Sequence, residues 1–222
     1  IFLGGMYNYD ESRLRMLRVP YVISGSGKTV PEDTGTYPKS ALVTTDTEIE
    51  SQSMVDYLCS CGHKRIAFIT SGDEGLGRCH LNGYKRSLEK NGLEYDEKLI
   101  IRLKPGKRIY TIENGYNCTC ELLKSGVDFS CIYAISDTLA VGACRAVIDS
   151  GKRVPEDYCV AGADGQDIAE YYHPSITTLK YPRVEIALQS VRTLFDMIDR
   201  KKVVKRQILG GTLIERESTR KL

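Results

Sequence analysis

Short apolar segments alternate with amphipathic segments along almost the whole chain. The apolar segments have the length of β-strands and lie at 1–5, 21–24, 41–45, 65–72, 99–103, 131–136 and 158–164. Between them, the sequence predicts helices at about 11–17, 48–61, 81–92, 112–124 and 139–147, with a last long helix at 184–198. Strands that are apolar throughout and alternate with helices predict an α/β fold in which helices cover both faces of parallel sheets. After the last helix, residues 206–218 predict two short strands around Gly210 and Gly211.

Two apolar stripes indicate which helix faces are buried. The last helix carries one stripe on a single side, typical of a helix that packs against a core: Val184, Ala187, Leu188, Val191, Leu194 and Ile198. In the helix at 112–124, Tyr116, Cys120 and Leu123 share a face, which leaves Cys118 on another one.

The eight cysteines show no pattern of a metal site or of a disulfide framework. Two C-x-C pairs occur, Cys59/Cys61 and Cys118/Cys120, and helical spacing turns the two thiols of each pair in different directions. Cys61 falls on the buried stripe of its helix. We therefore expect reduced thiols in a cytoplasmic protein, with neither metal nor cofactor.

The charge balance argues against a chain that itself grips nucleic acid. Lys and Arg total 31 and Asp and Glu total 29 among 222 residues. The one basic cluster, residues 200–206, follows the last helix, where cations suit the helix dipole and the solvent. No apolar run approaches the ~20 residues that a membrane-spanning helix needs, so we expect no membrane partner.

A glycine-rich run, residues 25–29, follows the strand at 21–24 and ends in Gly27-Lys28-Thr29 like a phosphate-binding loop. The phosphate-binding motif requires another glycine five residues before Gly27, where Val22 stands, and a helix afterwards, where Pro31 and Asp33 indicate a turn. The run is therefore not predicted to bind phosphate.

Polar residues at the ends of the predicted strands offer chemistry for holding a ligand. Parallel sheets bind ligands at the carboxyl ends of their strands, where Ser24, Ser71, Ser136 and Asp164 stand. Hydroxyl groups, a carboxylate and nearby aromatic rings suit a polyhydroxylated molecule better than they suit catalysis, and the three histidines form no Ser/His/Asp arrangement. From local chemistry alone, Asp164 is either a ligand-binding carboxylate or a cap or turn residue before Gly165.

Five segments in order resemble the effector-binding core of the LacI/GalR family of bacterial transcription regulators. They are CGHKRIAFITSG (61–72), HLNGYKRSLEKNGL (80–93), AISDTLAVGACRAVIDSGKRVPEDYCVAGADG (134–165), HPSITTLKYP (173–182) and LIERESTRKL (213–222). This family is similar in fold to periplasmic sugar-binding proteins, with two α/β lobes, three crossovers and a ligand cleft between the lobes.

The resemblance implies a division of the chain into two lobes. Residues 1–46 and 183–202 are expected to form an incomplete N-terminal lobe, and residues 47–182 and 203–222 the C-terminal lobe. The family's DNA-binding headpiece has no counterpart in this chain, which begins at Ile1 inside a strand. The chain is therefore expected to be a fragment of a longer regulator.

The resemblance also assigns the effector-binding residues. Asp164 matches the family's ligand carboxylate, Tyr110 its stacking aromatic residue, and Ser136 a polar contact that precedes Asp137, the expected cap of the next helix. Tyr181, at a crossover, is expected to line the cleft. Ser24 and the glycine-rich loop after it are expected to border the cleft from the N-terminal lobe.

The sequence departs from the family at two charged positions. His80 stands where the family usually has an arginine that reaches the effector, so that either His80 or Arg78 is expected to replace it, and His80 could equally be a packing residue. Gly25 stands where an aspartate is usual. Both changes indicate an unusual or repositioned effector.

The resemblance implies a non-enzymatic sensor. A sugar-like effector would close the lobes and thereby control operator binding through the headpiece of a cytoplasmic homodimer. The alternative from another class is a sugar-binding receptor of a transport system with the same fold. A signal peptide upstream would favour the receptor, and a helix-turn-helix upstream would favour the regulator.

Overall fold

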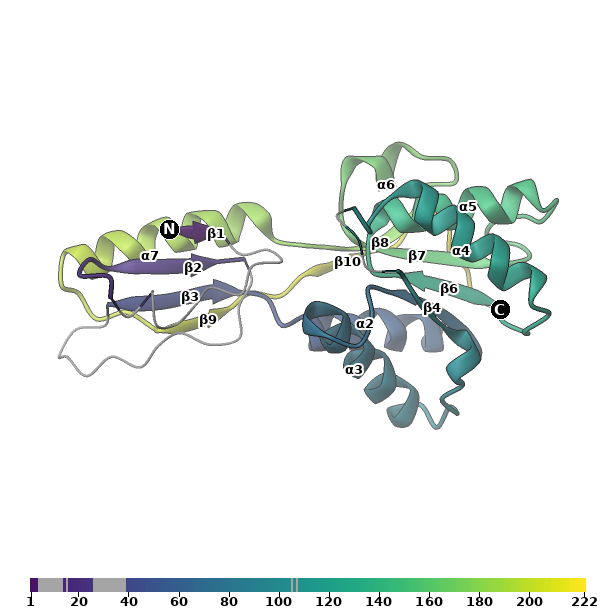
Figure 1. Ribbon diagram of the computed structural model, residues 1–222, viewed down its shortest axis with the longest axis horizontal. Coiled ribbons are helices and arrows are strands. Elements are labelled where there is room, and N and C mark those ends of the chain that lie inside the picture. Colours follow the sequence, from purple (N-terminus) through teal and green to yellow (C-terminus); the bar gives the residue numbers. More distant parts are fainter. Residues whose placement is uncertain (4–13, 15, 26–38, 105, 107) are drawn as a thin grey trace. The chain divides into compact units, whose positions relative to one another are not determined.

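The computed structural model describes residues 1–3, 14, 16–25, 39–104, 106 and 108–222. They form two compact units, residues 1–46 with 182–211 and residues 47–181 with 212–222, so the chain passes between units three times (Figure 1). The expected α/β fold with two parallel sheets and three crossovers is confirmed.

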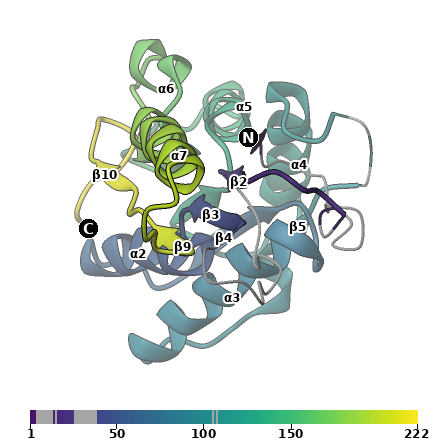
Figure 2. The same ribbon diagram turned by 90° about the vertical axis from the view of Figure 1, so that its left-hand side faces the viewer.

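The first unit is a parallel sheet covered by a helix. Its strands follow the order β1-β2-β3-β9, with the bounds Phe2–Leu3, Tyr21–Ser24, Ser40–Thr44 and Arg206–Ile208. Helix α7 (Arg183–Ile198) lies along β2 and β3 (Figure 2). The buried apolar cluster of this sheet contains Leu14, Tyr21, Ile23 and Leu42.

Helix α7 packs on this sheet with a different face from the predicted one. Ile186, Ser190, Thr193 and Met197 are its buried residues. The expected stripe is largely exposed: Val184, Leu188, Val191 and Ile198 are between 43% and 67% accessible, Ala187 is also exposed, and Leu194 is half-buried. The polar face is accommodated because Ser190 donates to Ser24 Oγ (2.9 Å) and Thr193 Oγ1 accepts from Gln207 (2.9 Å).

One predicted domain boundary is also wrong. Residues 203–211 were expected in the C-terminal lobe, but β9 pairs in parallel with β3, with Val43 opposite Gln207. The two short strands around Gly210 and Gly211 do exist, and they belong to two different sheets. A short edge strand is held in its sheet mainly by backbone hydrogen bonds. Its own sequence therefore does not show which of two sheets it joins.

The second unit is a six-stranded sheet between two helical layers. Its order is β10-β8-β7-β6-β4-β5, antiparallel only at β10 within the described strands. The strands are β4 (Ile66–Thr70), β5 (Ile100–Arg102), β6 (Cys131–Ala134), β7 (Cys159–Asp164), β8 (Thr177–Lys180) and β10 (Thr212–Ile214). The helices are α2 (Thr47–Ser60), α3 (Gly75–Lys90), α4 (Ile112–Lys124), α5 (Asp137–Asp149) and α6 (Asp167–Tyr171), with a 3₁₀ turn, η1, at Glu97–Leu99.

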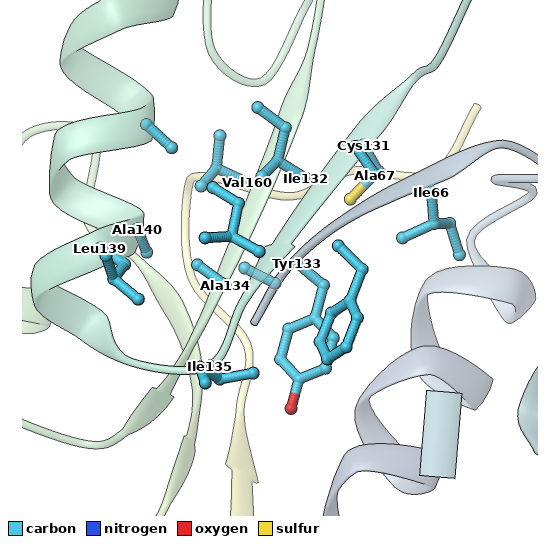
Figure 3. Packing of buried hydrophobic residues seen from close by; sticks show 14 of the residues in the cluster. Ile66, Ala67, Cys131, Ile132, Tyr133, Ala134, Ile135, Leu139, Ala140 and Val160 are labelled. Atoms are coloured by element: carbon cyan, nitrogen blue, oxygen red, sulfur yellow. The ribbon is translucent and has the colours of Figure 1, made fainter. Parts of the chain in front are cut away.

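The main core of the protein lies in this unit. Helices α2 and α3 contact each other on one side of the sheet, and α4 and α5 on the other (Figure 1). Figure 3 shows Tyr133 on the opposite side of β6 from Leu139 and Ala140 of α5. On the α2/α3 side, the Phe68 ring stacks between Tyr84 (centroids 4.9 Å apart) and Tyr133 (5.2 Å). Strands buried on both faces explain why their sequences are continuously apolar.

Helix α4 is also rotated relative to the prediction. Its buried residues are Gly115, Thr119 and Leu122, whereas Tyr116, Cys120 and Leu123 of the predicted stripe are only half-buried. Cys118 and Leu123, both half-buried, pack against the edge of the core. Gly115 and Gly142 let α4 and α5 approach closely: a Cβ at Gly142 would overlap the Ile112 carbonyl oxygen. A glycine leaves no apolar signal in a helical pattern, so the pattern pointed to the neighbouring face.

All eight cysteines lie within the described residues and are free thiols, and Cys61 is buried as predicted. The described residues contain no group of His, Cys, Asp or Glu side chains that could hold a metal ion. Within the same residues, no helix is both long and apolar enough to cross a membrane.

Gly142→Ala tests the close contact between α4 and α5. Alanine favours a helix by about 1 kcal/mol over glycine, but the added methyl group collides with backbone that cannot swing away. We expect the collision to dominate, with a net loss of about 1–3 kcal/mol in the free energy of unfolding, measured by urea titration. Gly210→Ala, where a Cβ meets no atom within 4 Å, is the control. A Gly142→Ala protein as stable as its parent would contradict the close packing.

Candidate functional site

The predicted ligand-binding residues of the second unit gather around the carboxyl ends of its parallel strands. His80 and Arg78 follow β4, Ser136 follows β6, Asp164 ends β7, and Tyr181 follows β8. Because β4, β6, β7 and β8 are neighbours in one parallel sheet, these positions share one edge. Tyr110 reaches the same region from the turn before α4, since its carbonyl oxygen accepts a hydrogen bond from Thr138 (3.1 Å) in the first turn of α5.

Asp164 adopts a backbone conformation that is rare for a residue with a side chain. Its φ angle is +104°, and the next residue, Gly165, has φ +65°. A Cβ at Gly165 would lie 2.6 Å from the Lys180 side chain, so the turn needs glycine there. The Asp164 carboxylate is half-buried and accepts a hydrogen bond from Gln166 Nε2 (3.1 Å), and its carbonyl accepts from the Tyr181 amide (3.2 Å). Strained conformations of this kind concentrate at functional sites.

A second carboxylate, Asp137, lies buried beneath this turn. Its Oδ2 accepts the Gln166 amide (2.6 Å) and its Oδ1 accepts the Thr178 hydroxyl (2.6 Å). Burial raises the pKa of Asp137 to about 6, and the charge of Asp164 acts in the same direction, whereas both hydrogen bonds oppose the shift. Asp137 was expected to be the cap of α5, but that prediction is wrong because Ser136 is the N-cap and Asp137 is the first helical residue.

Ser136 is occupied by this capping role. Its hydroxyl accepts the Leu139 amide (3.3 Å) and is 3.1 Å from the Thr138 hydroxyl. The side chain is buried. A serine hydroxyl has two acceptor sites and one donor, so Ser136 both begins the helix and links Thr138, and through it the Tyr110 carbonyl, to the strand end.

His80 and Arg78 have different environments on α3. Arg78 is exposed, and its Nε donates to the Asp73 carbonyl (2.7 Å). The His80 backbone carbonyl accepts from Ser51 of α2 (2.8 Å), and its Nδ1 is enclosed without a hydrogen-bond partner among the described residues. Burial lowers the pKa of His80 to about 4, so the imidazole is neutral near pH 7.

Several polar residues near these positions were not among the site residues predicted from the sequence. Thr178 and Gln166 contact Asp137, while Tyr133 lies beside Ser51 and near the carboxylates of Glu50, Asp164 and Asp137. Burial and then these three carboxylates raise the pKa of Tyr133. Asp137 could have been identified from the sequence, because it stands next to Ser136 at a strand end. Thr178 and Tyr133 could not, because threonine and tyrosine are common in any buried strand.

Ser24 lies in the first unit. It ends β2, is buried, and accepts a hydrogen bond from Ser190 of α7 (2.9 Å). The loop that was expected to border the ligand begins at Gly25, and its residues 26–38 lie outside the described part of the chain. Its role stays a prediction, as do the ligand contacts of all seven predicted site residues.

The comparisons with known proteins agree with this geometry. Residues 55–219 match the family described as "Periplasmic binding protein-like domain". The chain is 34% identical over 220 residues to the HTH-type transcriptional regulator MalR of Clostridium butyricum, covering 98% of this chain and 63% of that protein.

Two solved structures support the same assignment. A sugar-binding LacI-family regulator from Escherichia coli, complexed with phosphate, superposes with a TM-score of 0.81 at 28% identity, over 95% of this chain and 72% of that one. The complex of the transcriptional regulator CelR with cellobiose has a TM-score of 0.75 at 32% identity, over 90% of this chain and 59% of that one.

The fold and the strand-end site thus define a periplasmic binding protein-like module. The chain belongs to the effector-binding domains of this kind that are found in LacI-family transcriptional regulators. It spans about six tenths of the length of MalR. The expectation of a binding domain rather than an enzyme agrees with the relatives, which are named as regulators.

The neutral state of His80 predicts how stability depends on pH. The pKa of His80 is depressed in the folded protein, so the unfolded chain binds more protons between pH 6.5 and 4, and acidification favours unfolding there. From pH 7.5 to 5.0, His80→Gln should lose about 2 kcal/mol less unfolding free energy than the parent, as measured by urea titration at each pH.

His173→Gln is the matched control, because that side chain is 91% exposed. It should follow the parent at every pH. Equal pH dependence of the parent and His80→Gln would show that the imidazole is not buried in its neutral form.

Proposed function

We propose that this chain is the effector-sensing part of a bacterial transcription regulator. A sugar or sugar-like molecule binds at the carboxyl-end edge of the second sheet, with Asp164 accepting hydrogen bonds from its hydroxyl groups and Tyr110 packing on its apolar face. Tyr181, Ser136, His80 and Arg78 are further candidates for contacts from this unit.

The observation that carries this proposal is the conformation of Asp164. A positive φ angle at a residue other than glycine costs about 1–3 kcal/mol, and here it holds a half-buried carboxylate at the strand end. Hydrogen bonds to a charged group contribute about 1.5–3 kcal/mol each, so a fixed carboxylate is a strong anchor for a hydroxyl-rich ligand. The cellobiose complex of CelR supports a sugar as the ligand class.

The proposed regulation is a shift between conformations. The three chain crossovers between the units are positions at which their relative orientation can change. A ligand that binds one orientation more tightly moves the equilibrium by its difference in affinity, and typical coupling of about 1–3 kcal/mol alters operator affinity 5–150-fold.

The operator contact would come from a headpiece outside this chain. We further propose a cytoplasmic homodimer, because two-fold symmetric operators present one half-site to each protomer. Ser24 and the loop after it would contribute to the effector site from the first unit.

A sugar receptor of a transport system is the second candidate, favoured by the match to the periplasmic binding protein-like family. The two candidates differ in one measurable property. The full-length regulator changes its affinity for operator DNA when the sugar is added, whereas a transport receptor binds the sugar and has no operator.

Substitutions at Asp164 and Tyr110 test the site. A thermal-shift panel of cellobiose, ribose, other neutral sugars and polyols, purines, and inorganic phosphate first identifies the ligand. Asp164→Ala should then weaken its binding about 10- to 150-fold, as expected for the loss of one charged hydrogen bond, and Tyr110→Ala should weaken it at least about tenfold. Isothermal titration calorimetry measures both.

Asp167→Ala is the control for Asp164→Ala, because Asp167 is exposed in the first turn of α6, three residues further along the chain. It should bind like the parent. If Asp164→Ala and Tyr110→Ala also bind like the parent, the ligand site lies elsewhere.

A further inference from the structure

The turn that carries Asp164 is tied to one buried side chain. Asp137 is fully buried at the start of α5, and it is the acceptor for two donors from different elements. Its Oδ2 receives the Gln166 amide directly, at 2.6 Å. Its Oδ1 receives the hydroxyl of Thr178 from β8, also at 2.6 Å, and the same hydroxyl oxygen accepts the Gly165 amide at 3.3 Å.

The two amides that follow Asp164 are therefore anchored, one directly and one through Thr178, on the same carboxylate. The Gln166 side chain in turn donates to Asp164 Oδ2 (3.1 Å). Three adjacent strands supply the parts, with β6 leading into Asp137, β7 ending in Asp164 and β8 carrying Thr178. Fixing both peptide groups after Asp164 fixes the direction of its Cα–Cβ bond, and the hydrogen bond from the Gln166 side chain then orients the carboxylate.

We propose that Asp137 is a positioning residue, which holds Asp164 in its left-handed conformation through Gln166 and Thr178 and thereby sets the affinity for the effector. The statement about affinity rests on the proposed function. The statement about the turn does not, because the four residues can be studied in the unliganded protein.

The chemistry requires a carboxylate at position 137. Ionised aspartate offers acceptors only, which match the Gln166 amide and the Thr178 hydroxyl. Asparagine keeps one acceptor and presents an amino group to Thr178, so the threonine hydroxyl loses the acceptor that orients it. Protonation of Asp137 has a similar consequence.

The charged surroundings favour protonation at mildly acidic pH. The charges of Asp164 in β7 and of Arg216 in the segment after β10 act on Asp137, and the charge of Asp137 acts on the Tyr133 hydroxyl of β6. Burial and Asp164 raise the pKa of Asp137 to about 6, against the opposing effects of its hydrogen bonds and of Arg216. If the effector binds only the ionised form, its Kd rises about fourfold from pH 7.5 to 5.5, because the competent fraction falls by that factor.

Amide hydrogen exchange in the unliganded chain tests the positioning role. The protection of the Gly165 and Gln166 amides at pH 7.5, read by NMR, should fall at least about tenfold in Asp137→Asn. Thr178→Val should expose the Gly165 amide in the same way, and Thr178→Ser, which keeps the hydroxyl, should restore it. Asp167→Asn is the control and should match the parent.

Cellobiose affinity, measured by calorimetry at pH 7.5 and 5.5, tests the consequence for binding. The parent should lose about fourfold in affinity on acidification, while Asp137→Asn should bind weakly and equally at both pH values. A role in folding alone would lower the melting temperature of Asp137→Asn and leave the pH profile of binding unchanged.

Unchanged protection of both amides in Asp137→Asn, or lost protection with parental cellobiose affinity and pH profile, would overturn the proposal. If Asp137→Asn does not fold, Thr178→Val and Thr178→Ser decide by the same measurements. If the parent does not bind cellobiose or any sugar of the panel, the proposed function fails, and the exchange data alone decide whether Asp137 positions Asp164.

Discussion

A carboxylate buried between strand ends is the constraint on which the described site depends. Removing a charge from water is costly unless strong hydrogen bonds replace the lost hydration. Asp137 receives two at 2.6 Å, yet the pKa of this group still rises to about 6, so the compensation is incomplete. With a folded-state pKa above the unfolded value, the ionised form costs stability at neutral pH. An arrangement that costs stability and lies next to a strained residue is typical of a functional site.

The rigidity of the surrounding unit makes this arrangement possible. The Phe68 ring stacks between Tyr84 and Tyr133 on one side of the sheet, and α5 lies against β6 and β7 on the other side. Gly142 brings α4 so close to α5 that no methyl group fits between their backbones. Because β6 and β7 are held from both sides, their ends cannot drift apart, and short hydrogen bonds between Asp137 and the turn after β7 persist.

The alternation of apolar and amphipathic segments was sufficient to predict the α/β class with parallel sheets, whereas the two units and the three crossovers were predicted only through the family resemblance. The helix at 112–124 matches the structure at both ends, since a long periodic segment carries its own signal. The short strand at 21–24 also matches, because Pro20 before it and the glycine-rich run after it mark its ends. The faces of α4 and α7 could not be predicted in the same way. On α7, Ser190 and Thr193 meet hydrogen-bonding partners on the sheet, and the more apolar side stays exposed. A hydrophobic pattern shows that a face is apolar, but only a partner determines whether it is covered.

The site was predictable at its strand ends and not beneath them. Asp164 and Ser136 stand where a strand stops, and chain position alone makes such residues candidates. The partners of Asp137 come from a loop and from the interior of β8, more than twenty-five residues along the chain, and they meet only because β7 pairs with both neighbours.

His80 illustrates the same limit of sequence-based prediction. Its position in the chain made it a candidate for an effector contact, but its charge state depends on burial, which the sequence does not show. An arginine at this place would bring a permanent positive charge. The buried imidazole is neutral at pH 7, because its pKa is near 4. Any hydrogen bond that His80 makes to an effector therefore comes from an uncharged ring and is weaker than a charge-assisted one from a guanidinium. In the proposed site, this neutral ring beside the Asp164 carboxylate would favour a ligand that presents hydroxyl donors over an anion.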